Sequence, residues 1–208
     1  MSLDHAVADF FAAHHTPALT NLAWAVTSIG NEITLFLASL ILVIVCLVRG
    51  RQRDALMVAI GMAGSAALTV GIKNLVQRQR PGAEYRVPGA GADNSYSFPS
   101  GHTMNTTVFV ILLVAVLWPF LTTRAARTVA VVVAATTAIA VGVSRLYLGY
   151  HWFTDVLAGL LIGAAWAGGL VAWFRSRSVP TVVSRLSGES ARPVLTQAEI
   201  GRGGEGSS

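Results

Sequence analysis

Five long stretches of this 208-residue chain contain no charged side chain, and they constrain its fold more than any other feature. A helix that crosses a bilayer needs about 20 mostly apolar residues, so each stretch becomes a candidate span once the polar or aromatic residues at its ends are included. The stretches are 33–48, 55–72, 103–121, 128–143 and 156–174. We therefore predict an all-α fold, a polytopic transmembrane helical bundle with five clear spans.

The composition excludes several other classes of protein. Charged residues make up 12% of the chain and hydrophobic residues 53%, whereas an ordinary soluble domain is roughly 25% charged. Disorder needs more charge and less apolar surface, and a single cysteine cannot build a disulfide scaffold. The net charge of +5 would suit a nucleic-acid partner only if the positive residues gathered on a soluble face. We expect a membrane protein with no nucleic-acid partner.

The chain divides into three predicted parts. Residues 1–30 are expected to form an N-terminal interfacial or re-entrant segment, because 3–15 carry two aspartates and three histidines and 17–30 are apolar but short. Residues 31–177 form the predicted transmembrane domain. Residues 178–208 are rich in Ser, Gly, Arg and Glu without apolar periodicity, which predicts a disordered cytoplasmic tail.

Arginines in the short loops predict the orientation in the cell membrane. They cluster between the first and second spans, between the third and fourth, and after the fifth, and the positive-inside rule makes these loops cytoplasmic. The N-terminal residues and the loops 76–99 and 145–155 then lie outside. Further cations fall on that outer face, where the rule does not predict them, so a functional reason is expected. The loop arginines are Arg49, Arg51, Arg53, Arg124, Arg127, Arg175 and Arg177.

Three segments on the outer face contain residues that could take part in chemistry, and the first of them is 73–81. Lys73 and Arg80 stand seven residues apart, which predicts that both project from one helix face before Pro81 ends the helix. Lys73 is the only lysine in the chain. The alternative interpretation is that these cations only reach toward lipid headgroups.

The second segment is 98–102, at the start of the third span. Ser100 is expected to cap that helix, and Gly101 lets the backbone approach a ligand closely. The free N–H groups of the helix start can bind an anion, and His102 in the first turn could donate a proton. A plain helix cap beside an interfacial histidine is the alternative.

The third segment, 144–155, contains a candidate nucleophile. His151 and Asp155 are four residues apart, so they share a face if both open the last helix. The carboxylate can then accept a hydrogen bond from the imidazole, which fixes the tautomer and leaves the other nitrogen free to attack. Arg145 can bind phosphate with two nitrogens at once. A purely structural histidine–aspartate pair is the alternative.

Together the three segments supply fixed cations, an anion-binding helix start, a nucleophile with its orienting group, and an acid. Phosphoryl transfer requires this set, and the cations can do the electrostatic work of a metal, so neither a metal nor a cofactor is expected. Arg78 and Arg86 could attract an anionic substrate or only rim the loop, and we leave them outside the core set.

The patterns Lys-x6-Arg-Pro, Pro-Ser-Gly-His and Ser-Arg-x5-His-x3-Asp, in this order, resemble the signature of the type 2 phosphatidic acid phosphatase superfamily. The resemblance covers about residues 55–174 and implies a metal-independent membrane phosphatase with a phosphohistidine intermediate. It implies that His151 is the nucleophile, Asp155 its orienting group, and His102 the acid for the leaving alcohol and later the base for water. The residues implied to hold the phosphoryl group are Lys73, Arg80, Ser100, Gly101 and Arg145.

The family fold usually has six spans. Either residues 1–30 supply a sixth element here, or the first span is absent. The sequence leaves the oligomeric state open.

The predicted function is hydrolysis of a phosphomonoester or pyrophosphate on a lipid: a polyprenyl diphosphate such as undecaprenyl diphosphate, phosphatidic acid or phosphatidylglycerophosphate. Because the site is expected to face outward, we rank carrier-lipid recycling above phospholipid synthesis as its expected role. The main alternative is a lipid-phosphate binding or transport protein without catalysis, which would not need the paired histidines. Two further alternatives are considered. A vanadate-dependent haloperoxidase is disfavoured, because those related enzymes are soluble and this chain is not. A metal-dependent hydrolase would lose activity in a chelator, whereas the predicted phosphatase would not.

Overall fold

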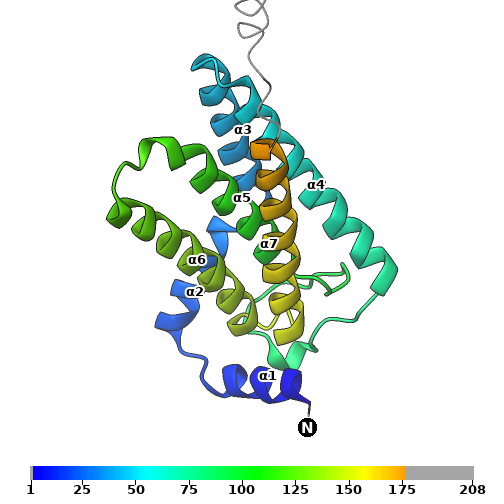
Figure 1. Ribbon diagram of the computed structural model, residues 1–208. Helices are drawn as coiled ribbons and strands as arrows, with labels where there is room; N and C mark the ends of the chain where they lie inside the picture. Colours follow the sequence, from blue (N-terminus) through cyan, green and yellow to red (C-terminus); the bar gives the residue numbers. More distant parts are fainter. Residues whose placement is uncertain (1, 177–208) are drawn as a thin grey trace, which may run out of the picture. The chain divides into compact units, whose positions relative to one another are not determined.

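The computed structural model describes residues 2–176, and these form α-helices and two short 3-10 turns with no strand (Figure 1). The all-α prediction is confirmed. The predicted tail, 178–208, lies outside the described residues. The helices are α1 Leu3–Ala13, α2 Pro17–Ile29, α3 Glu32–Val48, α4 Gln52–Val76, α5 Gly101–Leu117, α6 Arg124–Tyr147 and α7 Phe153–Ser176, and the 3-10 turns are η1 Ala83–Tyr85 and η2 Trp118–Phe120.

Four spans are long and apolar enough to cross a membrane: α4, α5 extended by η2, α6 and α7. The first predicted span, 33–48, corresponds to α3, which has 17 residues and reaches span length only as a pair with α2, bent by 41°. The bend follows from local chemistry. Gly30 ends α2, and the side chain of Asn31 caps α3 by accepting a hydrogen bond from Ile33 N at 2.9 Å. Within residues 2–176 the five predicted spans therefore become four, or five if the bent pair counts as one, with no sixth candidate.

Helix α5 is the centre of the bundle, and it packs against α3, α4, α6 and α7. Its side chains Val108 and Leu112 are fully buried together with Val58 of α4. Large apolar side chains on α3 remain exposed, Ile33 at 69% and Phe36 at 66% among them. Such a surface is costly in water and favourable in lipid, so the packing agrees with a membrane setting.

Two glycines allow α5 and α7 to approach each other closely. A Cβ on Gly159 would lie 2.9 Å from Ser100 O, and one on Gly163 would lie 2.9 Å from Met104 O. The small-xxx-small spacing therefore serves a helix contact within this bundle. At the end where both helices begin, the contact continues as a hydrogen bond of 3.0 Å from Ser100 N to Asp155 O. This contact positions the start of α7 against the start of α5.

Replacing Gly159 with alanine should lower the melting temperature in detergent, because the added methyl group meets backbone that cannot yield without separating α5 from α7. Overpacking of this kind costs about 1–3 kcal/mol. Gly168→Ala is the matched control on the same helix, since a Cβ there has no neighbour within 4 Å. Equal melting temperatures for the two variants would show that the contact does not limit the packing.

Candidate active site

The segment that follows α4 differs from its prediction. Lys73 lies in the last turn of α4, but the helix ends at Val76 because Gln77 adopts a left-handed conformation with φ 50°. Arg80 therefore lies beyond the helix. The prediction that Lys73 and Arg80 share one helix face until Pro81 ends the helix is wrong. Residue spacing alone could not show that the helix ends early at a residue without an obvious stop signal.

Lys73 and Arg80 still converge, because both bind the loop that precedes α5. The Lys73 ammonium donates to Tyr96 O. Arg80 donates from Nε to Ser95 O at 2.8 Å, and its Nη2 lies 2.7 Å from a carboxylate oxygen of Asp93. The loop thus fixes the two cations that the helix was expected to align.

Ser100 occupies the N-cap position of α5, as predicted, but its hydroxyl does not cap the helix. That hydroxyl accepts a hydrogen bond of 2.9 Å from Thr103 Oγ1 instead. A Cβ on Gly101 would lie 3.2 Å from Thr69 Cγ2, so the helix start packs tightly on α4. His102 follows in the first turn of α5 and is partly buried.

His151 and Asp155 form the predicted pair, although not from one helix. Helix α7 begins at Phe153, so His151 precedes it and the condition for a shared helix face is not met. The pair forms because Trp152 N donates to Asp155 Oδ2 at 2.9 Å and turns the chain back, which brings His151 Nδ1 to 3.5 Å from the same oxygen. His151 is 3% exposed and Asp155 is fully buried.

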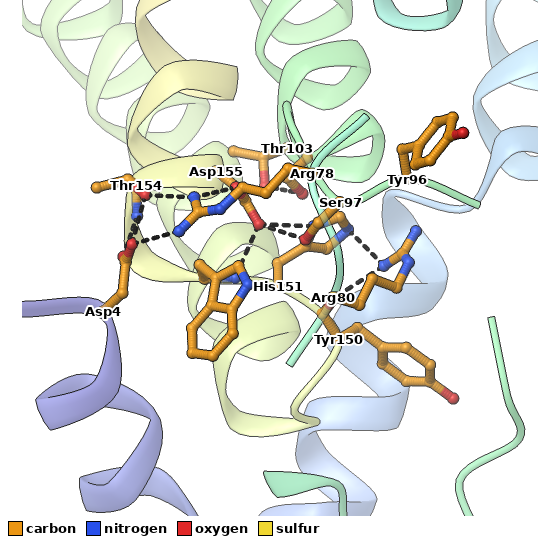
Figure 2. Close-up of polar contacts among 12 residues, drawn as sticks. Asp4, Arg78, Arg80, Tyr96, Ser97, Thr103, Tyr150, His151, Thr154 and Asp155 are labelled. Carbon is orange, nitrogen blue, oxygen red and sulfur yellow. Dashed lines mark hydrogen bonds and ion pairs between the residues drawn. The ribbon is translucent and has the colours of Figure 1, made fainter. Parts of the chain in front are cut away.

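Ser97 joins this pair, although no motif in the sequence predicted it. Its hydroxyl donates to Asp155 Oδ2 and lies 3.3 Å from His151 Nδ1, as Figure 2 shows. Ser97 is fully buried in a loop where serine is ordinarily exposed. The only sequence feature that could have identified Ser97 is its position three residues before Ser100, and a serine in a loop is too common to be distinctive.

The other imidazole nitrogen, Nε2, faces Arg80. Arg80 Nη1 lies 3.1 Å from His151 Nε2 and donates to Tyr150 O at 2.7 Å. Burial, reinforced by the positive charges of Arg80 and Arg145, lowers the pKa of His151 to about 3, against the opposite effect of Asp155. The imidazole is therefore neutral at pH 7. The arrangement suits a proton on Nδ1, toward the carboxylate, and a lone pair on Nε2.

A cavity of about 680 Å³ opens beside this cluster, and His102 and Arg145 both line it. Arg145 is 5% exposed, and it donates to Thr27 Oγ1 at 3.3 Å and lies 4.2 Å from the Tyr150 ring centre. Among the described residues its buried Nε has no hydrogen-bond partner, so one donor is available to a ligand. The lining residues are Trp24, Thr27, Ser28, Asn31, Thr34, Gly91, Ala92, Asp93, Asn94, His102, Arg145 and Tyr150.

Arg78 and Arg86 were left outside the core set, and the structure places both beside it. Arg78 Nη1 lies 2.6 Å from Asp155 Oδ1, in direct contact with the predicted orienting group. The Arg86 guanidinium stacks over Tyr150 at 5.7 Å, and its buried Nε has no partner among residues 2–176. Nothing in the motifs distinguished these arginines from loop charges.

The chain is similar in sequence to known proteins. Residues 54–178 match the model of the PAP2 superfamily. The chain is 31% identical over 168 residues, 78% of each chain, to phosphatidylglycerophosphatase B of Bacillus subtilis. It is 33% identical over 109 residues, 52% of this chain and 54% of the relative, to decaprenylphosphoryl-5-phosphoribose phosphatase of Mycolicibacterium smegmatis.

The fold is also similar to a crystal structure, that of a transmembrane PAP2 type phosphatidylglycerolphosphate phosphatase from Bacillus subtilis. The TM-score is 0.76 at 27% identity, with 86% of this chain and 87% of that chain covered. The predicted motifs all fall inside the region that matches the family model. The chain belongs to the PAP2 superfamily, the type 2 phosphatidic acid phosphatases, and is a multi-pass membrane lipid phosphatase.

Proposed function

We propose that this phosphatase works through a phosphohistidine on His151 Nε2. The observation that carries the proposal is the arrangement around one buried imidazole. Nδ1 faces Asp155 and Ser97, and Nε2 faces the guanidinium of Arg80. An imidazole held in this way has one defined tautomer, and a phosphoryl group that reaches Nε2 meets a cation at once.

In the first step the Nε2 lone pair of His151 attacks phosphorus, and the bond from phosphorus to the leaving oxygen breaks. His102 gives its proton to that oxygen, so the alcohol leaves neutral. In the second step His102 removes a proton from water, and the resulting hydroxide attacks the phosphohistidine. The N–P bond breaks and inorganic phosphate leaves.

The phosphoryl oxygens are proposed to lie among Lys73, Arg80 and Arg145, the hydroxyl of Ser100 and the N–H group of Gly101. His151 does not line the cavity, and Arg80 occupies the approach to Nε2. Attack therefore requires Arg80 to exchange that contact for the phosphoryl oxygens. These cations neutralise the negative charge of the phosphoryl group, a task that a metal ion would otherwise perform, so the proposed reaction is metal-independent.

The site is proposed to face the outside of the cell. The connections α3–α4 and α5–α6 lie at the end of the bundle opposite α1 in Figure 1. Both connections carry arginines, and positive loops remain in the cytoplasm. The arginines are Arg49, Arg51, Arg53, Arg124 and Arg127.

The cavity wall favours substrates in which the phosphate is attached to a hydroxylated alcohol. Asn31, Thr34 and Asn94 line the cavity beside His102, and the amide nitrogens of Asn31 and Asn94 donate to no group within residues 2–176. Amides and hydroxyls can bind the hydroxyls of a glycerol or a sugar. The names of the two relatives specify substrates of that kind, a glycerophosphate and a phosphoribose. We therefore rank phosphatidylglycerophosphate and polyprenyl-linked sugar phosphates above phosphatidic acid and polyprenyl diphosphates, and this ranking replaces the one that the orientation of the site suggested.

The test is phosphate release in detergent, with and without EDTA, from phosphatidylglycerophosphate, a polyprenyl-phosphoryl sugar phosphate, phosphatidic acid and undecaprenyl diphosphate. The expected result is release that EDTA does not alter, with the highest kcat/KM on the first two substrates. His151→Ala, purified in parallel, is the blank for contaminating phosphatases. Release lost in EDTA and restored by a divalent cation would refute metal independence. Binding of these lipids without release would favour a binding or transport role instead.

A further inference from the structure

The N-terminal helix α1 reaches the catalytic pair through one side chain. Asp4 accepts hydrogen bonds from Thr154 N at 2.9 Å and from Thr154 Oγ1 at 2.8 Å. Thr154 is the second residue of α7, so Asp4 satisfies a free N–H group at the start of that helix, as a capping residue would. A carboxylate is also favourable at a helix N-terminus. The cap of α7 is thus supplied by a residue that is 150 positions away in the chain.

Arg78 connects this cap to Asp155. One terminal nitrogen, Nη2, lies 2.6 Å from Asp4 Oδ2, and the other, Nη1, lies 2.6 Å from Asp155 Oδ1 (Figure 2). Nη1 also donates to Thr154 Oγ1 at 2.6 Å. The guanidinium lies 5.6 Å from the ring centre of Trp152, which limits its freedom further. Asp4 and Asp155 are therefore bridged by one planar, two-pronged cation.

The two oxygens of Asp155 consequently have separate partners. Oδ2 accepts from Ser97 and from Trp152 N and lies beside His151 Nδ1, whereas Oδ1 pairs with Arg78. A fully buried carboxylate needs such compensation, since an unpaired buried charge is strongly unfavourable. With both oxygens engaged, the carboxylate plane cannot rotate away from the imidazole.

Asp4 is itself suited to this task. Burial would raise its pKa, but the hydrogen bonds from Arg78 and Thr154 together with the charge of Arg78 hold that pKa below its usual value. Asp4 therefore stays ionised at neutral pH and keeps Arg78 oriented. Without this anion, Arg78 would be free to turn toward solvent, because its side chain is 30% exposed.

We propose that Asp4 and Arg78 are positioning residues that lock Asp155 against His151, so that α1 is part of the catalytic apparatus. The proposal rests on the proposed role of Asp155. It extends the site beyond the family match, which begins at residue 54. The competing possibilities are that Arg78 only attracts the anionic substrate, or that α1 only packs on the bundle. Substrate attraction predicts an effect on KM, whereas positioning predicts an effect on kcat.

The test compares Asp4→Asn with Asp9→Asn. Asp4→Asn keeps an oxygen for Thr154 N but removes the charge that pairs with Arg78. Asp9→Asn is the matched control, because Asp9 lies on the same helix and its charge acts on Tyr85 rather than on the catalytic pair. We expect Asp4→Asn to lower kcat on the order of 10-fold with KM within about twofold, the size of effect that a lost orienting partner produces. Asp9→Asn should remain at the wild-type kcat.

Three further variants separate positioning from folding. Arg78→Gln should lower kcat more than Asp4→Asn does, and the double variant should be no slower than Arg78→Gln, because residues in one network are not additive. Guanidinium at millimolar concentration should restore part of the kcat of Arg78→Ala and leave wild type unchanged. A misfolded variant would not recover in this way.

A wild-type kcat in Asp4→Asn, additive losses in the double variant, or a loss confined to KM would each overturn the inference. Asp155→Asn distinguishes failure of this inference from failure of the proposed function. If Asp155→Asn is inactive while Asp4→Asn is unaffected, only this inference fails. If Asp155→Asn retains wild-type kcat, the proposed function fails as well.

Discussion

Replacing His151 with alanine should lower kcat for lipid phosphate hydrolysis on the order of 10⁴-fold, the scale seen when the nucleophile of a covalent mechanism is removed. The imidazole is neutral, since burial, Arg80 and Arg145 lower the pKa of His151 to about 3, and its Nδ1 is held by Asp155 and Ser97. KM should change far less than kcat, because the cations that bind the phosphate remain.

The intermediate provides a second readout for the same variant. Substrate labelled in the phosphoryl group, quenched in alkaline detergent after a few milliseconds, should leave label on the wild-type protein that acid removes. His151→Ala should carry none. His14→Ala is the control, because His14 is an exposed histidine whose Nδ1 contacts only Phe10 O at 2.6 Å among the described residues. Label that persists in His151→Ala would assign the nucleophile to another residue.

The fold was predictable for those helices that are determined by a short, continuous stretch of sequence. Uncharged stretches of span length identified α4 to α7, because a bilayer imposes length and polarity on each helix separately. The 41° bend that joins α2 and α3 into one candidate span was not predicted. It depends on Gly30 and Asn31, two residues whose capping geometry becomes decisive only when both flanking helices form.

The candidate site was predictable to the extent that its residues lie in compact motifs. His151 and Asp155 meet as their spacing suggested, although a turn at Trp152 and not a helix face brings them together. Arg80 reaches His151 after a helix end that the spacing did not reveal. Close spacing restricts where two residues can lie even when the assumed backbone is wrong.

The residues that were missed act across long separations. Ser97 is 58 positions from its partner Asp155, and Asp4 is 74 positions from Arg78. A serine and an aspartate in polar segments have no periodicity that distinguishes them from surface residues. Their importance comes from burial beside a charged pair, which only the folded arrangement creates.

Replacing His102 with alanine should have an effect that depends on the leaving group. With a lipid alcohol, loss of the acid should lower kcat by about 10²–10⁴-fold, because an alkoxide is a poor leaving group without a proton. With p-nitrophenyl phosphate the departing anion needs no proton, so formation of the phosphohistidine should stay fast. Hydrolysis of the intermediate still needs a base, so His102→Ala should release one equivalent of nitrophenolate per enzyme in a burst and then turn over slowly.

The burst separates the two duties assigned to one histidine. His102 lies in the first turn of α5 and lines the cavity with Arg145. The double variant His102→Ala/His151→Ala should show no burst, which ties the released equivalent to Nε2. If His102→Ala instead lost equal activity on both substrates and accumulated no phosphoenzyme, His102 would act in binding or in the attack itself. The cavity would then have to supply a different proton donor, and Tyr150 and Asp93 are the titratable neighbours that line it.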